Sequence, residues 1–237
     1  MASFRHSGKL GDIVYSLPCV RLLGQGRYYI RLGDPLTESE ANVILPLLRA
    51  QSYIEEATIW ANQEFEHDLD RFRKLHPMWT NLADCHLFAL GLASFPRNRK
   101  WLEAPDPLNP PQPVAISRSD SFRGAPGFWE EVYSLVAERA FFVGTRKEHA
   151  DFESLLGPIE YVRTRDLLEL ARLLAGANLF IGNQSCPYAI AEGLKIPCIQ
   201  EVYHFTPNCI FDRPNAVHVW EASEVGPAIA RLMPITP

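Results

Sequence analysis

Hydrophobic and polar positions alternate in a regular order through the second half of the chain. Short apolar runs predict buried strands, and between them apolar residues recur three or four positions apart, which is typical of amphipathic helices. The predicted strands lie at 114–117, 140–143, 159–162, 178–181 and 198–202, and the predicted helices at 127–139, 148–156, 166–175, 187–194 and 221–232. Strands that alternate with helices predict parallel βαβ units in a doubly wound sheet.

The first half has a less regular pattern of the same kind. It predicts strands around Phe4, at 27–32 and at 54–60, and helices at 12–23 and 38–51. Pro46 is expected to kink the second of these helices, because proline lacks the backbone N–H that a helix interior requires. Between residues 64 and 98 the pattern predicts helices without fixing their ends. We interpret this half as a shortened version of the same fold.

A proline-rich segment separates the two halves. Five prolines lie between residues 104 and 113, a density that excludes a helix or a central strand and favours an extended, semi-rigid connection. The sequence therefore predicts an N-terminal Rossmann-like domain at 1–104, a linker at 105–113 and a C-terminal domain at 114–237. The fold class that follows is α/β, with two Rossmann-like domains.

Charge and composition exclude several classes of protein. The formal net charge is −5, and residues 1–113 carry 12 basic and 13 acidic side chains, so a general nucleic-acid-binding surface is not predicted. Small basic clusters at 71–74 and 97–100 are interpreted as solvated faces. The longest apolar stretch, 167–180, is interrupted by polar residues, and the N-terminus has no signal-peptide pattern. We expect a cytoplasmic protein without stable membrane insertion.

The cysteines and tryptophans are interpreted as packing residues. The five cysteines are widely spaced without a CxxC pair, which predicts reduced, mostly buried thiols and no zinc site. Trp60, Trp79 and Trp101 are expected in the core or between the domains rather than in a sugar-binding platform.

The first of four loops with candidate chemistry lies at residues 6–12. It follows the opening strand and leads into a helix, whose N-terminal N–H groups favour anions. Gly8 and Gly11 permit close approach of the backbone to a ligand, and Lys9 is a candidate for contact with a phosphate. Asp12 is either the N-cap of the helix or a general base on an acceptor hydroxyl, and spacing alone leaves both open.

The other three loops, at 117–124, 144–148 and 182–187, also run from a strand into a helix. Ligands of open parallel sheets bind beyond the carboxyl ends of the strands, so these loops are predicted to hold a nucleotide diphosphate. The alternatives stay open: the first is an ordinary polar loop, and Glu148 either accepts from ribose hydroxyls or caps its helix. The predicted donor-binding residues are Gly11, Ser117, Arg118, Arg123, Gly144, Thr145, Glu148, Asn183, Gln184, Ser185 and Cys186.

Two segments resemble the heptosyltransferases of glycosyltransferase family nine. The first runs from His6 through the Gly11-Asp12 pair to Leu17-Pro18, and the second runs from Phe142 to Pro197. The resemblance covers about residues 4–24 and 114–202, and the middle of the chain matches no known pattern. It implies a GT-B fold, in which an acceptor domain at 1–104 faces a donor-binding domain at 114–237 across a cleft. It also implies metal-independent, inverting transfer from a nucleotide-diphosphate sugar without a cofactor.

The resemblance also implies roles for single residues, and the chain departs from the family at some of them. The family's general base falls on Asp12, with Lys9 in the same loop near the phosphates. The family's donor contacts fall on Ser117, Arg118, Thr145, Glu148, Gln184, Ser185 and Cys186. An acidic sugar contact and a histidine of the family are replaced by Gln184 and Ala189. The resemblance therefore does not extend to heptose as the sugar or to lipopolysaccharide as the acceptor, and the expected acceptor is a glycan, a small molecule or modified DNA.

Three functional hypotheses follow from these residues. The leading one is an inverting glycosyltransferase with Asp12 as the base and Lys9 beside it. The second is a non-catalytic nucleotide-sugar binding protein, which the missing acidic residue and histidine favour. The third is a transferase acting on hydroxylated bases of DNA, which the shortened N-terminal half and the basic clusters favour and the balanced charge disfavours.

Overall fold

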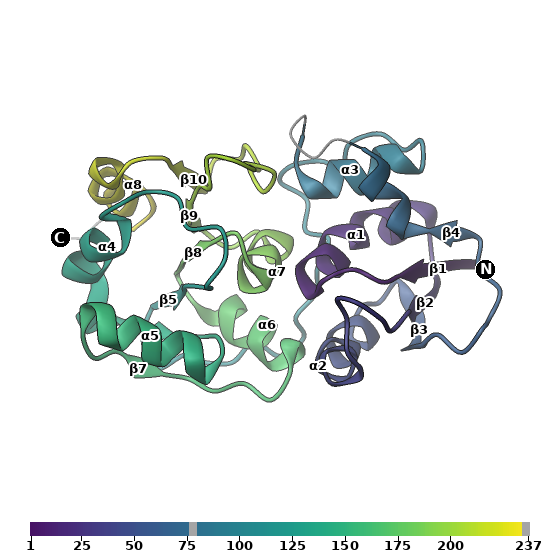
Figure 1. Cartoon of the computed structure of the whole chain (residues 1–237), viewed down its shortest axis with the longest axis horizontal. Helices are drawn as coiled ribbons and strands as arrows, with labels where there is room; N and C mark the ends of the chain where they lie inside the picture. Colours follow the sequence, from purple (N-terminus) through teal and green to yellow (C-terminus); the bar gives the residue numbers. More distant parts are fainter. Residues whose placement is uncertain (76–79, 234–237) are drawn as a thin grey trace.

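The computed structural model describes residues 1–75 and 80–233, so Trp79 lies outside the described residues. Two parallel sheets lie side by side, the N-terminal one on the right and the C-terminal one on the left of Figure 1. Helices flank both sheets. The predicted fold class of two Rossmann-like α/β units is therefore confirmed. The domain boundaries and the roles of the two halves stay predictions.

The N-terminal sheet has the strand order β3-β2-β1-β4, and all of its pairs are parallel. The winding direction reverses between β1 and β4, which is the place where open α/β sheets bind ligands. Its strands are β1 (Ala2–His6), β2 (Gly26–Ile30), β3 (Ile54–Ile59) and β4 (His67–Asp68). The helices of this half are α1 (Leu10–Leu23), α2 (Glu38–Arg49), the 3-10 helix η1 (Leu69–Lys74) and α3 (Leu82–Ala89).

The prediction of helices alone between 64 and 98 is wrong, because β4 lies there. Only two of its residues pair with β1, which is too short a run for a period-two pattern to mark a strand. Pro46 lies inside α2 as expected.

The C-terminal sheet has the order β10-β9-β8-β5-β6-β7, again with parallel pairs, and its winding reverses between β5 and β8. Its strands are β5 (Val114–Ser117), β6 (Ala140–Phe142), β7 (Glu160–Tyr161), β8 (Leu179–Asn183), β9 (Cys198–Glu201) and β10 (Ala216–Val219). Its helices are α4 (Phe128–Val136), η2 (Ala137–Arg139), α5 (Arg146–Leu156), α6 (Leu167–Gly176), α7 (Cys186–Leu194), η3 (Ala222–Glu224) and α8 (Val225–Leu232). The five predicted strands are present, and β10 was not predicted.

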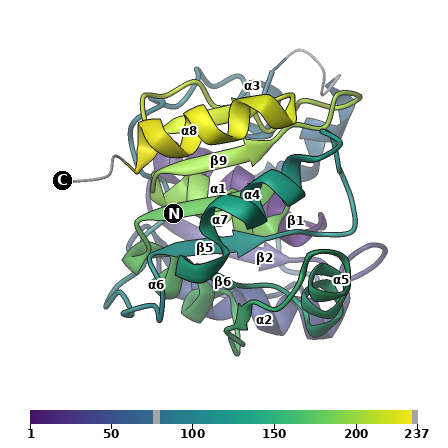
Figure 2. The same cartoon turned by 90° about the vertical axis from the view of Figure 1, so that its left-hand side faces the viewer.

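The two halves share one hydrophobic core. Helices α6 and α7 cover the face of the C-terminal sheet that is turned toward α1 and α2, and their apolar side chains join a cluster that runs from Phe4 to Ala216. Helices α4, α5 and α8 cover the opposite face over a second cluster, and lie toward the viewer in Figure 2. Trp101 is 2% exposed and packs on Phe211 and Lys195, which confirms its prediction as a packing residue.

The connection between the sheets carries no helix or strand from residue 101 to 113. It packs along α6, where the Arg172 Nε–H donates to the carbonyl of Pro105 and the Leu108 N–H donates to the carbonyl of Arg172. All five cysteines are free thiols, and all but Cys186 are buried, as predicted. Within the described ranges no helix is long and apolar enough to cross a membrane.

Candidate functional site

The N-termini of α1 and α7, one from each half, meet at the centre of the molecule. A Cβ placed on Gly11 would lie 3.7 Å from the Cα of Cys186, an ordinary van der Waals distance, so the two helix ends are in contact. Both ends carry partial positive charge, and two such ends in contact favour an anion between or beside them. The structure therefore brings together the first and the fourth predicted loops, which are more than 170 positions apart in the sequence.

Asp12 lies in the first turn of α1 at this junction. Asp12 is not the N-cap residue, because that position is Lys9, whose side chain makes no cap hydrogen bond. Burial raises the pKa of Asp12, while the charge of Arg73, the Lys9 backbone N–H and the charge of Lys9 lower it, and Asp70 raises it further. A carboxylate whose pKa is raised by burial is a stronger base than an exposed one and is suited to accept a proton.

Asp70 and Arg73, which follow β4, complete the surroundings of this loop together with His6; Asp70 was not predicted as a site residue. Asp70 accepts hydrogen bonds from the Ser7 N–H at 3.1 Å and the Ser7 hydroxyl at 2.7 Å, and it pairs with Arg73. The Nδ1 atom of His6 accepts from the Gly8 N–H at 2.7 Å. Arg73 belongs to the basic cluster interpreted as a solvated face, but its guanidinium reaches the Asp12 loop. The sequence pattern did not predict β4, and β4 is the strand that places Asp70 and Arg73 beside β1.

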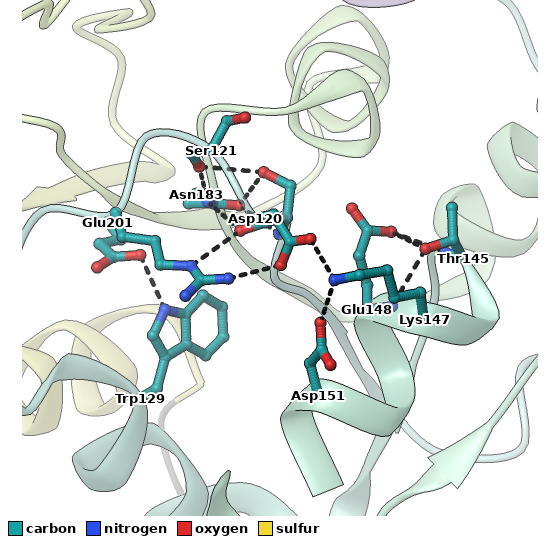
Figure 3. A network of polar contacts seen from close by, with 11 residues as sticks. Asp120, Ser121, Trp129, Thr145, Lys147, Glu148, Asp151, Asn183 and Glu201 are labelled. Carbon is teal, nitrogen blue, oxygen red and sulfur yellow. Dashed lines mark hydrogen bonds and ion pairs between the residues drawn. The ribbon is translucent and has the colours of Figure 1, made fainter. Parts of the chain in front are cut away.

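The side chain of Asn183, at the end of β8, fastens the loop that follows β5 (Figure 3). Its Oδ1 atom accepts from the Ser119 N–H at 3.0 Å and the Ser119 hydroxyl at 3.2 Å. Its Nδ2 atom donates to the carbonyls of Ser119 at 3.1 Å and Ser121 at 2.6 Å. Asn183 thus joins the second and fourth predicted loops, and its side chain is engaged by protein rather than directed at a ligand.

The same loop presents two arginines with different surroundings. Arg118 is 8% exposed, and its buried Nε–H has no hydrogen-bond partner among the described residues. Burial lowers the pKa of Arg118, Arg123 lowers it further, and Glu201 opposes the shift. A buried guanidinium with an unpaired N–H is suited to an anionic ligand. Ser117, directly before it, is buried at the end of β5.

Arg123 and the loop after β6 are tied together through Asp120 (Figure 3). Asp120 pairs with Arg123 at 2.6 Å and with Lys147 at 2.7 Å, and Lys147 also pairs with Asp151 at 2.6 Å. These groups are exposed, so the pairs contribute little stability and serve to hold the loop. The second and third predicted loops are therefore adjacent, as the neighbouring positions of β5 and β6 require.

Thr145 and Glu148 form a capping box at the start of α5, after Gly144. The Thr145 hydroxyl accepts from the Glu148 N–H at 3.2 Å, and Glu148 Oε2 accepts from the Thr145 N–H and hydroxyl at 2.8 Å. Of the two alternatives for Glu148, the structure shows the helix cap. The predicted contact with ribose hydroxyls stays a prediction.

Besides Asn183, the fourth loop contains a second engaged amide, that of Gln184, and a helix cap, Ser185. The Nε2 atom of Gln184 donates to the Thr206 carbonyl at 2.8 Å and to Asn208 Oδ1 at 3.0 Å. Its Oε1 atom accepts from the Tyr203 N–H at 3.0 Å. Ser185 is the N-cap of α7 and accepts from the Tyr188 N–H. Through these contacts Gln184 holds the segment that follows β9 in place.

Cys186 opens α7 beside Gly11. Burial raises the pKa of its thiol to about 12, and the negative charges of Asp12 and Glu148 act in the same direction. The thiol is therefore neutral at physiological pH and is not an activated nucleophile. Its backbone, at the first turn of the helix, is the part suited to an anion.

Lys9 is the N-cap residue of α1. The Lys9 side chain is exposed, and its carbonyl accepts from the Ile13 N–H.

Two hollows of about 440 Å³ lie elsewhere, one lined by 32–38 and one between α6 and the connection, and neither contains the predicted site residues. Over residues 1–75 and 80–233, no three His, Cys, Asp or Glu side chains are grouped as a metal site. The metal-independent mechanism stays a prediction.

Two parallel α/β units joined by a connection and meeting at helix N-termini define the class of fold found in nucleotide-sugar glycosyltransferases. No protein-family description and no curated sequence matches the chain, but solved structures match it. A glycosyl transferase of family 9 from Veillonella parvula aligns with a TM-score of 0.63 and 11% identity over 100% of this chain and 90% of its own.

Two structures from E. coli give similar values. Heptosyltransferase WaaC with ADP-2-deoxy-2-fluoro heptose aligns with a TM-score of 0.61 and 11% identity over 92% of each chain. The iron-containing dodecameric glycosyltransferase TibC, from an enterotoxigenic strain, aligns with a TM-score of 0.64 and 16% identity over 98% of this chain and 75% of its own. The chain has the fold of the family-nine glycosyltransferases, which confirms the resemblance at the level of fold.

Proposed function

We propose that this protein is an inverting glycosyltransferase that moves a sugar from a nucleotide-diphosphate donor to an acceptor hydroxyl. The observation that carries the proposal is the junction of α1 and α7, where Asp12 lies beside a helix N-terminus of the other half. A base for the acceptor and an anion-binding group for the donor are thereby adjacent. Structures with the same fold, such as WaaC, are described with ADP and with an ADP-heptose analogue.

In the proposed reaction, Asp12 takes the proton of the acceptor hydroxyl as its oxygen attacks the anomeric carbon of the donor. The bond between that carbon and the diphosphate oxygen breaks on the opposite face, so configuration inverts. The N-terminus of α7 at Cys186 and the buried guanidinium of Arg118 stabilise the negative charge on the leaving nucleotide diphosphate. Lys9, at the rim, approaches the phosphates, and the remaining predicted donor contacts shape the three loops around them.

A second candidate is a nucleotide-sugar binding protein without transferase activity. The observation that favours it is Gln184, whose amide is engaged by Tyr203, Thr206 and Asn208. Gln184 therefore does not replace the acidic sugar contact that the resemblance leads one to expect. This candidate predicts donor binding without turnover.

The test begins with thermal stabilisation by a panel of nucleoside diphosphates and their sugars, with and without magnesium. A ligand present at 100 times its Kd adds roughly 2.7 kcal/mol to the free energy of unfolding. Turnover of the stabilising donor is then measured for the wild type, for Asp12→Asn, and for Asp166→Asn as a control at the N-cap of α6. We expect Asp12→Asn to lose about 10²- to 10⁴-fold in kcat with donor binding retained. Equal turnover in Asp12→Asn would refute the assigned base, and binding without any turnover would support the second candidate.

A further inference from the structure

The 3-10 helix η1, directly after β4, places the guanidinium of Arg73 against the loop that carries Asp12. A Cβ placed on Gly8 would lie 2.9 Å from Arg73 Nη2 and 3.0 Å from the Cβ of Asp12. Arg73, Asp12 and the ring of His6 therefore surround the same glycine, and a side chain at position 8 would meet all three. Asp12 follows β1 and Arg73 follows β4, and the winding of the N-terminal sheet reverses between these two neighbouring strands.

Arg73 is held in this place by a short chain of contacts. Its Nη1 atom pairs with Asp70, and Asp70 is fastened to the backbone and hydroxyl of Ser7. Its guanidinium also lies 4.8 Å from the ring centroid of Phe72. Although 41% of the Arg73 side chain is exposed, Asp70 and Phe72 restrict it. Holding a long, exposed side chain in one place costs side-chain entropy. The contacts of Arg73 with Asp70 and Phe72 therefore distinguish it from a freely solvated cation.

The charges that face Asp12 come from several elements. Arg73 and Lys9 are the cations, and Asp70 is an anion that Arg73 itself neutralises in part. His6 and His86 are buried, and burial lowers the pKa of both, so they are neutral at pH 7. The thiols of Cys186 and Cys209, from α7 and the segment after β9, are also neutral, because burial raises their pKa values to about 12. Arg73 is the charge that most lowers the pKa of Asp12.

We propose that Arg73, fixed by Asp70, is a positioning residue that keeps Asp12 ionised when the site is occupied. The inference rests on the proposed role of Asp12 as general base. A donor diphosphate adds negative charge beside Asp12, and a cation on the other flank opposes protonation of the carboxylate. Lys9 is exposed. Arg73 is paired with Asp70 and lies beside the loop that carries Asp12, which suits it to act on the carboxylate.

The test compares Arg73→Ala and Arg73→Lys with Arg71→Ala, a control on the same 3-10 helix whose side chain is exposed. We expect the acid limb of kcat/KM for Arg73→Ala to move to higher pH, with a loss of about tenfold on that limb and little loss on the alkaline side. Arg73→Lys restores part of the loss because it keeps the charge, and the KM for the donor stays the same. A loss of equal size at every pH would overturn the proposal.

A second measurement separates this inference from the proposed function. The carboxyl ¹³C resonance of Asp12, assigned by its absence in Asp12→Asn, is titrated without ligand in the wild type and the three variants. A midpoint at higher pH in Arg73→Ala, and an unchanged midpoint in Arg71→Ala, supports the role of Arg73 even when no donor turns over. An unchanged midpoint in Arg73→Ala, with transfer intact, rejects the inference and leaves the proposed function standing.

Discussion

Replacing Asn183 by alanine tests whether one buried amide holds the donor loop in place. The substitution removes the four hydrogen bonds from this side chain to Ser119 and Ser121. A typical intramolecular hydrogen bond contributes about 0.5 to 1.5 kcal/mol net, and the freed loop groups regain part of this from water. We therefore expect Asn183→Ala to lower the free energy of unfolding by about 2 to 4 kcal/mol, and to weaken donor binding because the 117–124 loop loses its fixed shape.

Urea denaturation at pH 7 measures the loss, and hydrogen exchange of the Ser119 amide locates it. Asn178→Ala is the matched control, since Asn178 is exposed just before the opposite end of β8. The control is expected within about 0.5 kcal/mol of the wild type. If Asn183→Ala also falls within that range, and the Ser119 amide keeps its protection, the amide does not hold the loop and the reasoning is refuted.

Two further predictions concern buried charge. Glu192 is fully buried and pairs with both Arg213, at 2.8 Å, and Lys195. Glu192→Gln leaves these cations uncompensated and is expected to cost about 3 to 5 kcal/mol in urea denaturation, and a loss below 1 kcal/mol would contradict this. Burial lowers the pKa of His6 from 6.5 to about 3, so between these values the unfolded chain binds a proton that the folded chain does not. Its contribution to stability is therefore complete above pH 6.5 and falls toward pH 3, by up to about 1.4 kcal/mol per pH unit. His6→Asn should fall less steeply than the wild type in denaturation at pH 4 to 7, and parallel curves would count against it.

The sequence was sufficient for the strands and helices of the second half because their patterns are long and local. The helix at 166–175, for example, differs from α6 by one residue at each end. Strands β4 and β10 were not predicted, and in β4 the two polar residues His67 and Asp68 carry no apolar pattern that marks a strand. Their pairing is decided by distant neighbours, β1 and β9.

The candidate site divides in the same way. The sequence by itself determined the polar loops after the strands, because a strand followed by glycine, hydroxyl or acidic residues and a helix is readable within ten residues. The helix caps of Glu148 and Ser185 are local as well, because each bonds to a residue three positions away. Only the tertiary structure decided that Asn183 and Gln184 fasten loops and that Arg73 lies beside the Asp12 loop. These roles depend on contacts between segments far apart along the chain. Such contacts are fixed by the pairing of β5 with β8 and of β1 with β4, which no local pattern records.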